Sequence, residues 1–316
     1  MVSMRLSLHV FSFFIIKYYR VKENYSRRIA FKKMAAATAI AIAGEGLINR
    51  ISAAETILDD NLKGKVNHSV CRWCYNTIPL EDLCKAAKKI GLTSIELVGP
   101  DEWPVLKKYG LTSALPWGAG LGIEKGFNDP QYHEALIKSY EEVIPKAAAA
   151  GYKQIICFSG NRNGLSDEQG IKNCTVGLKR LMSVAEKYKV TVVMELLNSK
   201  VNHKDYQCDH TVWGASLVDN IGSEYFKLLY DIYHMQIMEG DVIATIKKFS
   251  NYISHYHTGG VPGRNEIDET QELNYPAIMK AILETGYKGY VAQEFIPKRP
   301  DKLASLKQGV QICDVV

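Results

Sequence analysis

The chain has 316 residues, of which 47% are hydrophobic and 23% are charged. These proportions are those of a globular protein with a sizeable core, and they exclude an intrinsically disordered chain. The formal net charge is only +5. Because the excess gathers before residue 35, the remainder is close to neutral, so we expect a small-molecule partner and no nucleic acid. The early basic residues are Arg20, Lys22, Arg27, Arg28, Lys32 and Lys33.

The first 54 residues have the order of an export signal. Arg27 and Arg28 precede an apolar, alanine-rich run over 34–44, and small residues follow as far as Ala54. The arginine pair resembles a twin-arginine signal, which predicts cleavage after Ala54 and a periplasmic protein. A cytoplasmic protein with an ordinary first helix is the alternative. The apolar run is shorter than the about 20 residues that span a bilayer, so we expect no stable membrane span in the mature protein.

The seven cysteines do not form the framework of a small disulfide-rich domain. Cys71 and Cys74 form a CxxC, but the surrounding residues are typical of a strand. In a strand, residues three apart lie roughly 10 Å from each other, beyond the limit of about 7 Å for a disulfide. No second CxxC completes a zinc site. We therefore interpret both residues as free thiols of a strand.

From residue 60 onward, short apolar runs rich in β-forming residues alternate with longer helical patterns. No linker or change of composition divides residues 60–316, so we predict one domain. A series of βα units without a break favours a single (β/α)8 TIM barrel of the α/β class over an open sheet. The eight predicted strands are 66–71, 94–98, 111–115, 154–158, 191–196, 227–232, 252–256 and 289–295.

The helical patterns between these strands are amphipathic, and several of them end at a glycine. Leu80, Leu83, Cys84 and Ala87 form one apolar stripe with the spacing of a helix. A glycine directly before the next strand is typical of a helix that ends in a left-handed conformation. We predict such helix ends at Gly91, Gly151 and Gly286.

Four strands in the second half of the chain end in an ionisable residue, although the rest of each strand is apolar or aromatic. These residues are Glu195, Asp231, His257 and Glu294. The carboxyl ends of barrel strands meet at one mouth, so we expect the four side chains to lie close together. No lysine or arginine occupies the same strand ends to neutralise the acids, which disfavours a plain salt-bridge network. The set predicts one divalent metal ion, with Mn²⁺ or Mg²⁺ favoured and Co²⁺ or Zn²⁺ acceptable.

Two further residues near the predicted mouth are candidates for binding a substrate. His234 lies three residues after Asp231, just beyond the strand, and a structural histidine is its alternative interpretation. Arg264 lies in a glycine-rich loop after the seventh predicted strand, where its forked donors could hold a carboxylate or a hydroxyl. A solvated loop charge is the alternative for Arg264. We expect His255 to point toward the helices and leave it out of the site.

The stretch DIYHMQIMEGD over 231–241, together with HYH, VPGRNE and ELNYP further on, resembles hydroxypyruvate isomerase and its close relatives. These belong to the xylose isomerase-like barrels, and the resemblance covers about residues 65–300. It implies an isomerase that holds its metal with Glu195, Asp231, His257 and Glu294, and in which Glu195 and Glu294 also transfer protons.

Two reactions stay open on this resemblance. Hydroxypyruvate isomerases often have glutamine where this chain has His257, and histidine there is more similar to the ketose 3-epimerases. The first predicted reaction is therefore the conversion of hydroxypyruvate to tartronate semialdehyde. The alternative is the isomerisation or epimerisation of a periplasmic sugar. A non-catalytic sugar-binding barrel is a remote alternative. A nuclease similar to endonuclease IV is disfavoured, because strands 94–98, 111–115 and 154–158 lack the extra histidines that a three-zinc site needs. The sequence leaves open whether the protein forms a homo-oligomer.

Overall fold

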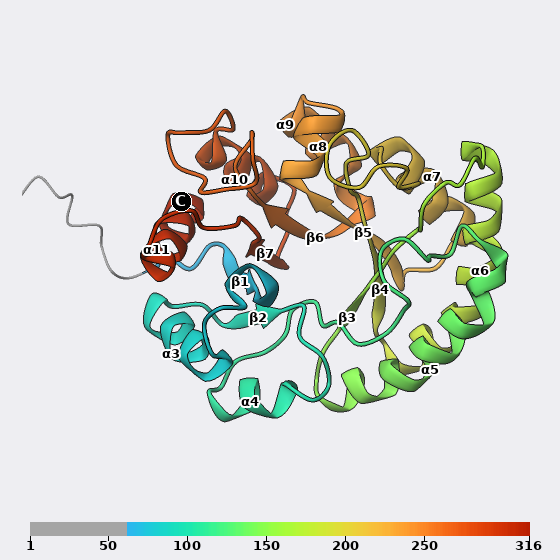
Figure 1. Ribbon diagram of the computed structural model, residues 1–316, viewed down its shortest axis with the longest axis horizontal. Coiled ribbons are helices and arrows are strands. Elements are labelled where there is room, and N and C mark those ends of the chain that lie inside the picture. The colour runs from blue at the N-terminus through green and yellow to red at the C-terminus, as the bar shows by residue number, and fades with distance from the viewer. Residues whose placement is uncertain (1–61) are drawn as a thin grey trace, which may run out of the picture. The chain divides into compact units, whose positions relative to one another are not determined.

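The computed structural model describes residues 62–316. The predicted signal segment, 1–54, lies outside these residues. Seven strands occupy the centre of the described part and helices surround them (Figure 1). The strands are β1 (Asn67–Cys71), β2 (Ser94–Glu96), β3 (Gln154–Cys157), β4 (Thr191–Glu195), β5 (Phe226–Asp231), β6 (Ile253–Thr258) and β7 (Tyr290–Gln293).

All strand pairs of the sheet are parallel, and the strand order is β2-β1-β7-β6-β5-β4-β3. The prediction of an eighth strand over 111–115 is wrong, because this segment forms only an isolated bridge between Thr112 and Ser94. It still links β2 to β3, since the Leu115 carbonyl accepts from the N–H of Leu97 at 2.9 Å and the Pro116 carbonyl accepts from the N–H of Ile156 at 3.4 Å. Pro116 follows directly and has no N–H to donate to a longer ladder. The fold is therefore an α/β, TIM-barrel-like fold.

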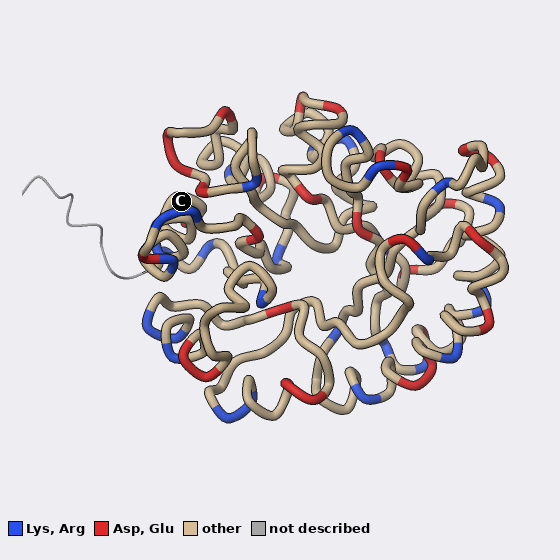
Figure 2. Tube along the Cα trace, in the orientation of Figure 1, with Lys and Arg blue, Asp and Glu red and all other residues tan. Residues whose placement is uncertain are grey.

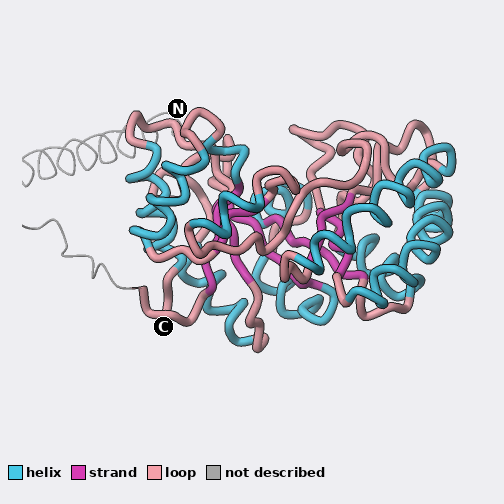
Figure 3. Tube along the Cα trace, turned by 90° about the horizontal axis from the view of Figure 1, so that it is seen from below, coloured by secondary structure: helices cyan, strands magenta, loops and turns pink. Residues whose placement is uncertain are grey.

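The helices lie on the outside of the strands, as Figure 3 also shows from a second direction. α5 packs against α6 and α6 packs against α7. The helices are α3 (Leu80–Ile90), α4 (Trp103–Lys108), α5 (His133–Ala149), α6 (Asp167–Tyr188), α7 (Thr211–Ile221), α8 (Ile232–Met238), α9 (Val242–Phe249), α10 (Tyr275–Glu284) and α11 (Lys302–Cys313), and the short 3₁₀ turns are η2 (Arg72–Tyr75), η3 (Pro130–Tyr132) and η4 (Ser250–Tyr252).

The sequence signals for helix ends are confirmed at α3. Glu81 lies in its first turn and Lys88 in its last, so the charges oppose the helix dipole. Gly91 then ends the helix with a φ of 98°, a conformation that costs a residue with a Cβ more than it costs glycine. The two other predicted glycine stops, Gly151 and Gly286, have φ values of 88° and 83°.

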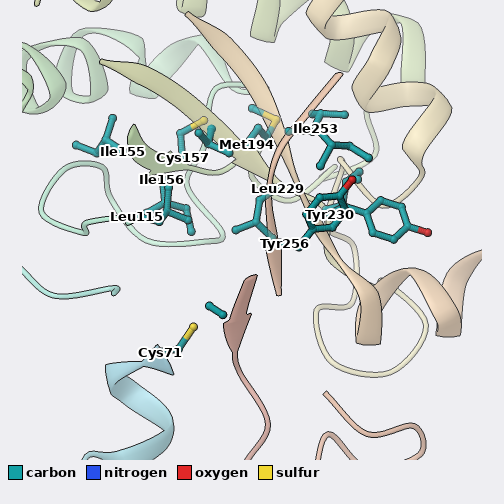
Figure 4. Packing of buried hydrophobic residues seen from close by; sticks show 14 of the residues in the cluster. Cys71, Leu115, Ile155, Ile156, Cys157, Met194, Leu229, Tyr230, Ile253 and Tyr256 are labelled. Atoms are coloured by element: carbon teal, nitrogen blue, oxygen red, sulfur yellow. The ribbon is translucent and has the colours of Figure 1, made fainter. Parts of the chain in front are cut away.

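The core is a continuous apolar cluster built mainly from the strands and the inner faces of the helices. Leu115, Ile156 and Met194 all belong to this cluster, part of which Figure 4 shows. All seven cysteines are buried and free, which confirms the prediction of free thiols for Cys71 and Cys74. The assignment of Cys74 to a strand is wrong, however, because the chain turns into η2 after Cys71. This turn brings Trp73 toward the ends of the strands instead of continuing β1.

Lys, Arg, Asp and Glu are distributed over the outer helices and loops, and acidic residues also lie among the central strands (Figure 2). Most outer charges are exposed, whereas Glu96, Glu195, Asp231 and Glu294 are buried. Within residues 62–316, no helix is both long enough and apolar enough to cross a membrane.

Candidate active site

The structure brings together the four residues predicted from the strand ends. Glu195 and Asp231 end β4 and β5, His257 is the penultimate residue of β6, and Glu294 follows β7 directly. One ligand atom from each of them lies within 4.8 Å of every other, and all four side chains are buried. Parallel strands with matching register explain this convergence, since Asp231 pairs with His257 across β5 and β6.

His257 lies between the two glutamates of the cluster. Its Nδ1 is 2.8 Å from Glu294 Oε2 and 3.3 Å from Glu195 Oε1. Burial, followed by the charge of Glu294, raises the pKa of Glu195. Burial also acts to raise the pKa of Glu294, but Arg264 and His257 outweigh it and hold that pKa well below its ordinary value. The two carboxyl groups therefore differ in their affinity for a proton, although they are neighbours.

Arg264 reaches into the acidic cluster from the loop after β6. Its Nη2 is 2.6 Å from Glu294 Oε2 and 3.4 Å from Asp231 Oδ2, and its guanidinium lies over the rings of Trp73 and Tyr233 at 5.0 and 5.4 Å. The expectation that the acids have no cationic partner is thus wrong. A loop residue supplies the partner, and strand-end positions alone do not show it. In this structure Arg264 is bound to the acids themselves and is buried.

His234 lies at the mouth, as predicted, because Asp231 begins helix α8. Asp231 Oδ1 accepts the backbone N–H of His234 at 3.0 Å, which is an N-cap contact. Asn198 donates its backbone N–H to Nδ1 of the ring at 3.1 Å. The ring proton is therefore on Nε2, which makes no hydrogen bond among the described residues. Burial and the charge of Arg264 keep the pKa of His234 well below its ordinary value, so the ring is neutral.

Three residues of the site were not predicted. The indole N–H of Trp73 donates to Glu294 Oε1 at 2.8 Å. His255 was expected to face the helices, and this is wrong, because residues two apart in a strand share a face. His255 Nε2 and His257 Nε2 both lie next to Glu96 Oε1, at 2.7 and 2.8 Å. Glu96 ends β2, so the strand-end signal that identified the other acids could also have identified Glu96.

A cavity of about 480 Å³ opens beside the cluster. Glu195, Arg264 and Glu294 form its polar side. Its other walls are mostly apolar and include the rings of Trp117 and Phe158, whose centroids are 5.6 Å apart and whose planes are tilted by 50°. Arg264 is the only lysine or arginine among the described residues that line this cavity.

The donor set fits a divalent metal ion. Three buried carboxylates meet one guanidinium and one imidazole, so negative charge is left uncompensated, which is costly in a buried site. Glu195 Oε1 makes no hydrogen bond within residues 62–316. Oxygen-rich sets with one imidazole suit Mn²⁺ or Mg²⁺ better than sulfur-rich sets do.

Glu266, of the VPGRNE string, holds two loops of the mouth together. Its carboxylate accepts the backbone N–H groups of Lys298 and Arg299, both at 3.0 Å, and the hydroxyl of Ser305 at 2.9 Å. Burial acts to raise the pKa of Glu266, but these hydrogen bonds outweigh it and lower that pKa.

We expect Glu266→Gln to reduce the free energy of unfolding at pH 7 by about 1–3 kcal/mol, because the buried Ser305 hydroxyl and two part-buried N–H groups lose a charged acceptor. The folded pKa lies below the unfolded one, so this stabilisation is present above the unfolded pKa of about 4.3 and is lost as the pH falls through the folded pKa. Urea denaturation at pH 7 and near pH 3.5 measures the change. Glu272→Gln, at an exposed carboxylate, is the control. A deficit that is equal at both pH values would contradict this role.

Comparisons with known proteins agree with the fold. The model of the xylose isomerase-like TIM barrel family matches residues 84–313. Hydroxypyruvate isomerase of Escherichia coli (strain K12) is 31% identical over 226 residues, which cover 67% of this chain and 86% of the bacterial protein. A 2-oxo-tetronate isomerase of Cupriavidus necator is 28% identical over 238 residues, which cover 71% of this chain and 90% of that protein.

Among solved structures, the AP endonuclease, family 2 from Brucella melitensis is similar with a TM-score of 0.69. It is 23% identical, and the match covers 76% of this chain and 97% of the other. This likeness supports the fold.

Proposed function

The chain belongs to the xylose isomerase-like TIM barrel family and is an isomerase, and on this premise we propose that it is a metal-dependent enzyme that moves a proton between adjacent carbons of a small hydroxy-carbonyl compound. The observation that carries the proposal is the buried cluster of Glu195, Asp231, His257 and Glu294 beside an open cavity. These four residues would hold one divalent metal ion, with Mn²⁺ or Mg²⁺ favoured.

A metal ion in this position supplies positive charge that polarises a carbonyl and acidifies the neighbouring C–H. Glu294 is suited to take the proton, because its pKa is held well below the ordinary value and it stays ionised. Glu195 has a raised pKa and is suited to hold a proton and return it. Environments that push two neighbouring pKa values apart are typical of an acid/base pair.

His234 is proposed to stabilise the enediolate that forms when the C–H proton leaves. Its Nε2–H is buried and has no partner among the described residues, so it is available to a substrate oxygen. The neutral ring keeps this proton and donates a hydrogen bond. Arg264, at the edge of the cavity, would contact the substrate from the same side as Glu294.

The favoured substrate is hydroxypyruvate or a similar small compound, with tartronate semialdehyde as the product from hydroxypyruvate. This choice is supported by the relatives named hydroxypyruvate isomerase and 2-oxo-tetronate isomerase. The transfer removes the proton from the carbon that bears the hydroxyl and returns it to the former carbonyl carbon.

The cavity favours a second candidate, a sugar-sized ketose. Hydroxypyruvate has about seven non-hydrogen atoms, whereas a cavity of about 480 Å³ lies within the range of about 300–1,000 Å³ typical of pockets for larger ligands. The tilted rings of Trp117 and Phe158 offer an apolar surface to a larger substrate. Arg264 is already paired with Glu294, and the described residues that line the cavity include no other lysine or arginine that could pair with a substrate carboxylate. If the proton returned to the opposite face of the same carbon, the reaction would be an epimerisation.

Solvent exchange tests the proposal. We expect the Mn²⁺-loaded enzyme to incorporate deuterium from heavy water into the reacting C–H of hydroxypyruvate, followed by mass spectrometry or proton NMR. A panel of ketoses under the same conditions compares the two substrate classes through kcat/KM. Binding of the whole panel without any exchange would support the sugar-binding alternative and would overturn the proposed activity.

We also propose that residues 1–54 direct export to the periplasm, on the basis of the twin-arginine-like pattern. A mature N-terminus that begins directly after Ala54 would support this assignment, and a retained N-terminus in the cytoplasm would contradict it.

A further inference from the structure

Glu96 is a buried carboxylate outside the proposed ligand set, and it contacts His257, a proposed metal ligand. Glu96 ends β2, and its Oε1 is 2.8 Å from Nε2 of His257 and 2.7 Å from Nε2 of His255. The three side chains are fully buried. The two imidazoles come from the same face of β6, and their rings meet edge to face at 5.2 Å. Glu96 therefore joins β2 to β6 below the cluster that faces the cavity.

These contacts define which nitrogen of His257 carries a hydrogen. An ionised carboxylate has acceptors only, so both imidazoles must donate to Glu96 from Nε2. A neutral His257 then has its lone pair on Nδ1. That nitrogen is 2.8 Å from Glu294 Oε2 and 3.3 Å from Glu195 Oε1. Without a metal ion, Nδ1 must also carry a hydrogen to contact Glu294 Oε2 at 2.8 Å. A metal ion bound between the carboxylates would take the place of that hydrogen, with Nδ1 as its ligand.

We infer that Glu96 is a positioning residue that holds His257 with Nδ1 toward Glu195 and Glu294, and that it thereby increases the affinity of the site for a divalent metal. The inference rests on the metal site of the proposed function. A carboxylate that accepts the second N–H of a metal-binding histidine fixes the orientation of the ring and makes the ligand more basic. Mutation of such partners typically weakens metal affinity about 10–100-fold.

A second metal site is the alternative for these residues, because Cys71 Sγ is 3.7 Å from His257 Nε2 and 3.9 Å from Glu96 Oε1. The nitrogen–oxygen distances of 2.7 and 2.8 Å argue against it. They are ordinary hydrogen-bond lengths. Two atoms that each bind a zinc ion at about 2.0–2.1 Å in tetrahedral geometry would lie roughly 3.3 Å apart. The geometry therefore favours hydrogen bonds.

His255 holds Glu96 in this position. Glu96 Oε2 has no hydrogen-bond partner among the described residues, so Oε1 takes both imidazole N–H groups. Without His255, the carboxylate would keep only its bond to His257 and could rotate. His255→Gln is expected to weaken metal binding in the same direction as a change at Glu96, but by less.

Metal affinity provides the first test. Metal-free protein is titrated with Mn²⁺, and free Mn²⁺ is measured by electron paramagnetic resonance. We expect Glu96→Ala to weaken binding about 10–100-fold. Glu96→Gln keeps a carbonyl acceptor but loses the charge, so its loss should be smaller. Ser94→Ala is the matched control, since Ser94 lies on the same face of β2 and loses hydrogen bonds from Ser69 at 2.8 Å and from the backbone N–H of Ala114 at 2.9 Å, but no contact with His257. Equal affinities for Glu96→Ala and Ser94→Ala would overturn the inference.

The tautomer provides a second test, which a purely structural role would not affect. Long-range proton–nitrogen NMR of the Zn²⁺-loaded protein should show a protonated Nε2 and a metal-bound Nδ1 for His257. The protonated Nε2 signal should weaken or broaden in Glu96→Ala. Metal bound at Nε2 in the original protein would overturn the inference. If Glu96→Ala does not fold, Glu96→Gln decides the question with the same spectra.

Different results would contradict the proposed metal site and the role of Glu96. A protein that folds but binds neither Mn²⁺ nor Zn²⁺ contradicts the proposed metal site itself. A protein that binds Mn²⁺ with an affinity independent of residue 96 contradicts only the role of Glu96.

Discussion

Glu294→Gln is expected to lower kcat by about 10²–10⁴-fold, which is the usual contribution of a positioned acid/base group. The amide keeps the shape of the side chain and can still accept the indole N–H of Trp73, but it cannot take a proton. We expect part of the metal affinity to survive, because Glu195, Asp231 and His257 remain. Steady-state kinetics together with the metal content of the purified variant measure both effects.

Glu272→Gln is the matched control for this change. Glu272 is exposed and contacts Gln236, away from the acidic cluster, so its amide variant should keep full activity. Near-normal turnover of Glu294→Gln with metal bound would rule out the proton-transfer role of Glu294. A loss of activity that parallels a loss of all bound metal would leave Glu294 as a ligand only and would equally contradict that role.

Removal of divalent metal is expected to have an effect of similar size. We expect treatment with a chelator to reduce activity at least about 10²-fold, because electrostatic stabilisation of a developing charge typically contributes that much. Addition of Mn²⁺ or Mg²⁺ should restore it. The physical reason is that Arg264 and His257 do not fully offset the three buried carboxylates of the cluster. Atomic emission measures the residual metal content, and activity is plotted against it to show how far turnover depends on the metal.

The thermal midpoint provides the control for chelation. Ions that bind the folded protein raise its stability through mass action, so Mn²⁺ should raise the midpoint of the chelated protein. Full activity at a residual metal content of about one hundredth of an equivalent would contradict the proposed metal dependence. If Mn²⁺ restores the activity at once, the loss of activity on chelation does not result from unfolding.

Much of the fold follows from patterns that lie within short segments of the chain. Seven of the eight predicted strands are present, since runs such as Thr191–Glu195 are apolar and rich in β-branched residues. Glycine stops at Gly91, Gly151 and Gly286 are also local signals. The segment 111–115 has the composition of a strand, but its pairing depends on its neighbours in space, which its composition does not show. Pro116, directly after it in the sequence, was a local signal against a longer ladder.

The convergence of the candidate site could also be predicted, because parallel barrel strands end at one mouth. That reasoning identified Glu195, Asp231, His257 and Glu294 as a group, and the structure places them within 4.8 Å of one another. The prediction that the chain is an isomerase of this family is confirmed by its relatives.

The sequence alone determined the strand-end residues, the family and the class of enzyme, because these depend on local patterns and on motifs that are contiguous in the chain. Only the tertiary structure decided the partners of those residues. Glu96 and His257 are 161 positions apart, and Arg264 reaches the acids from a loop. Such contacts depend on the register between strands and on the path of a loop. The hydrogen on Nε2 of His257 therefore depends on the contact between Glu96 of β2 and His257 of β6 in the folded protein.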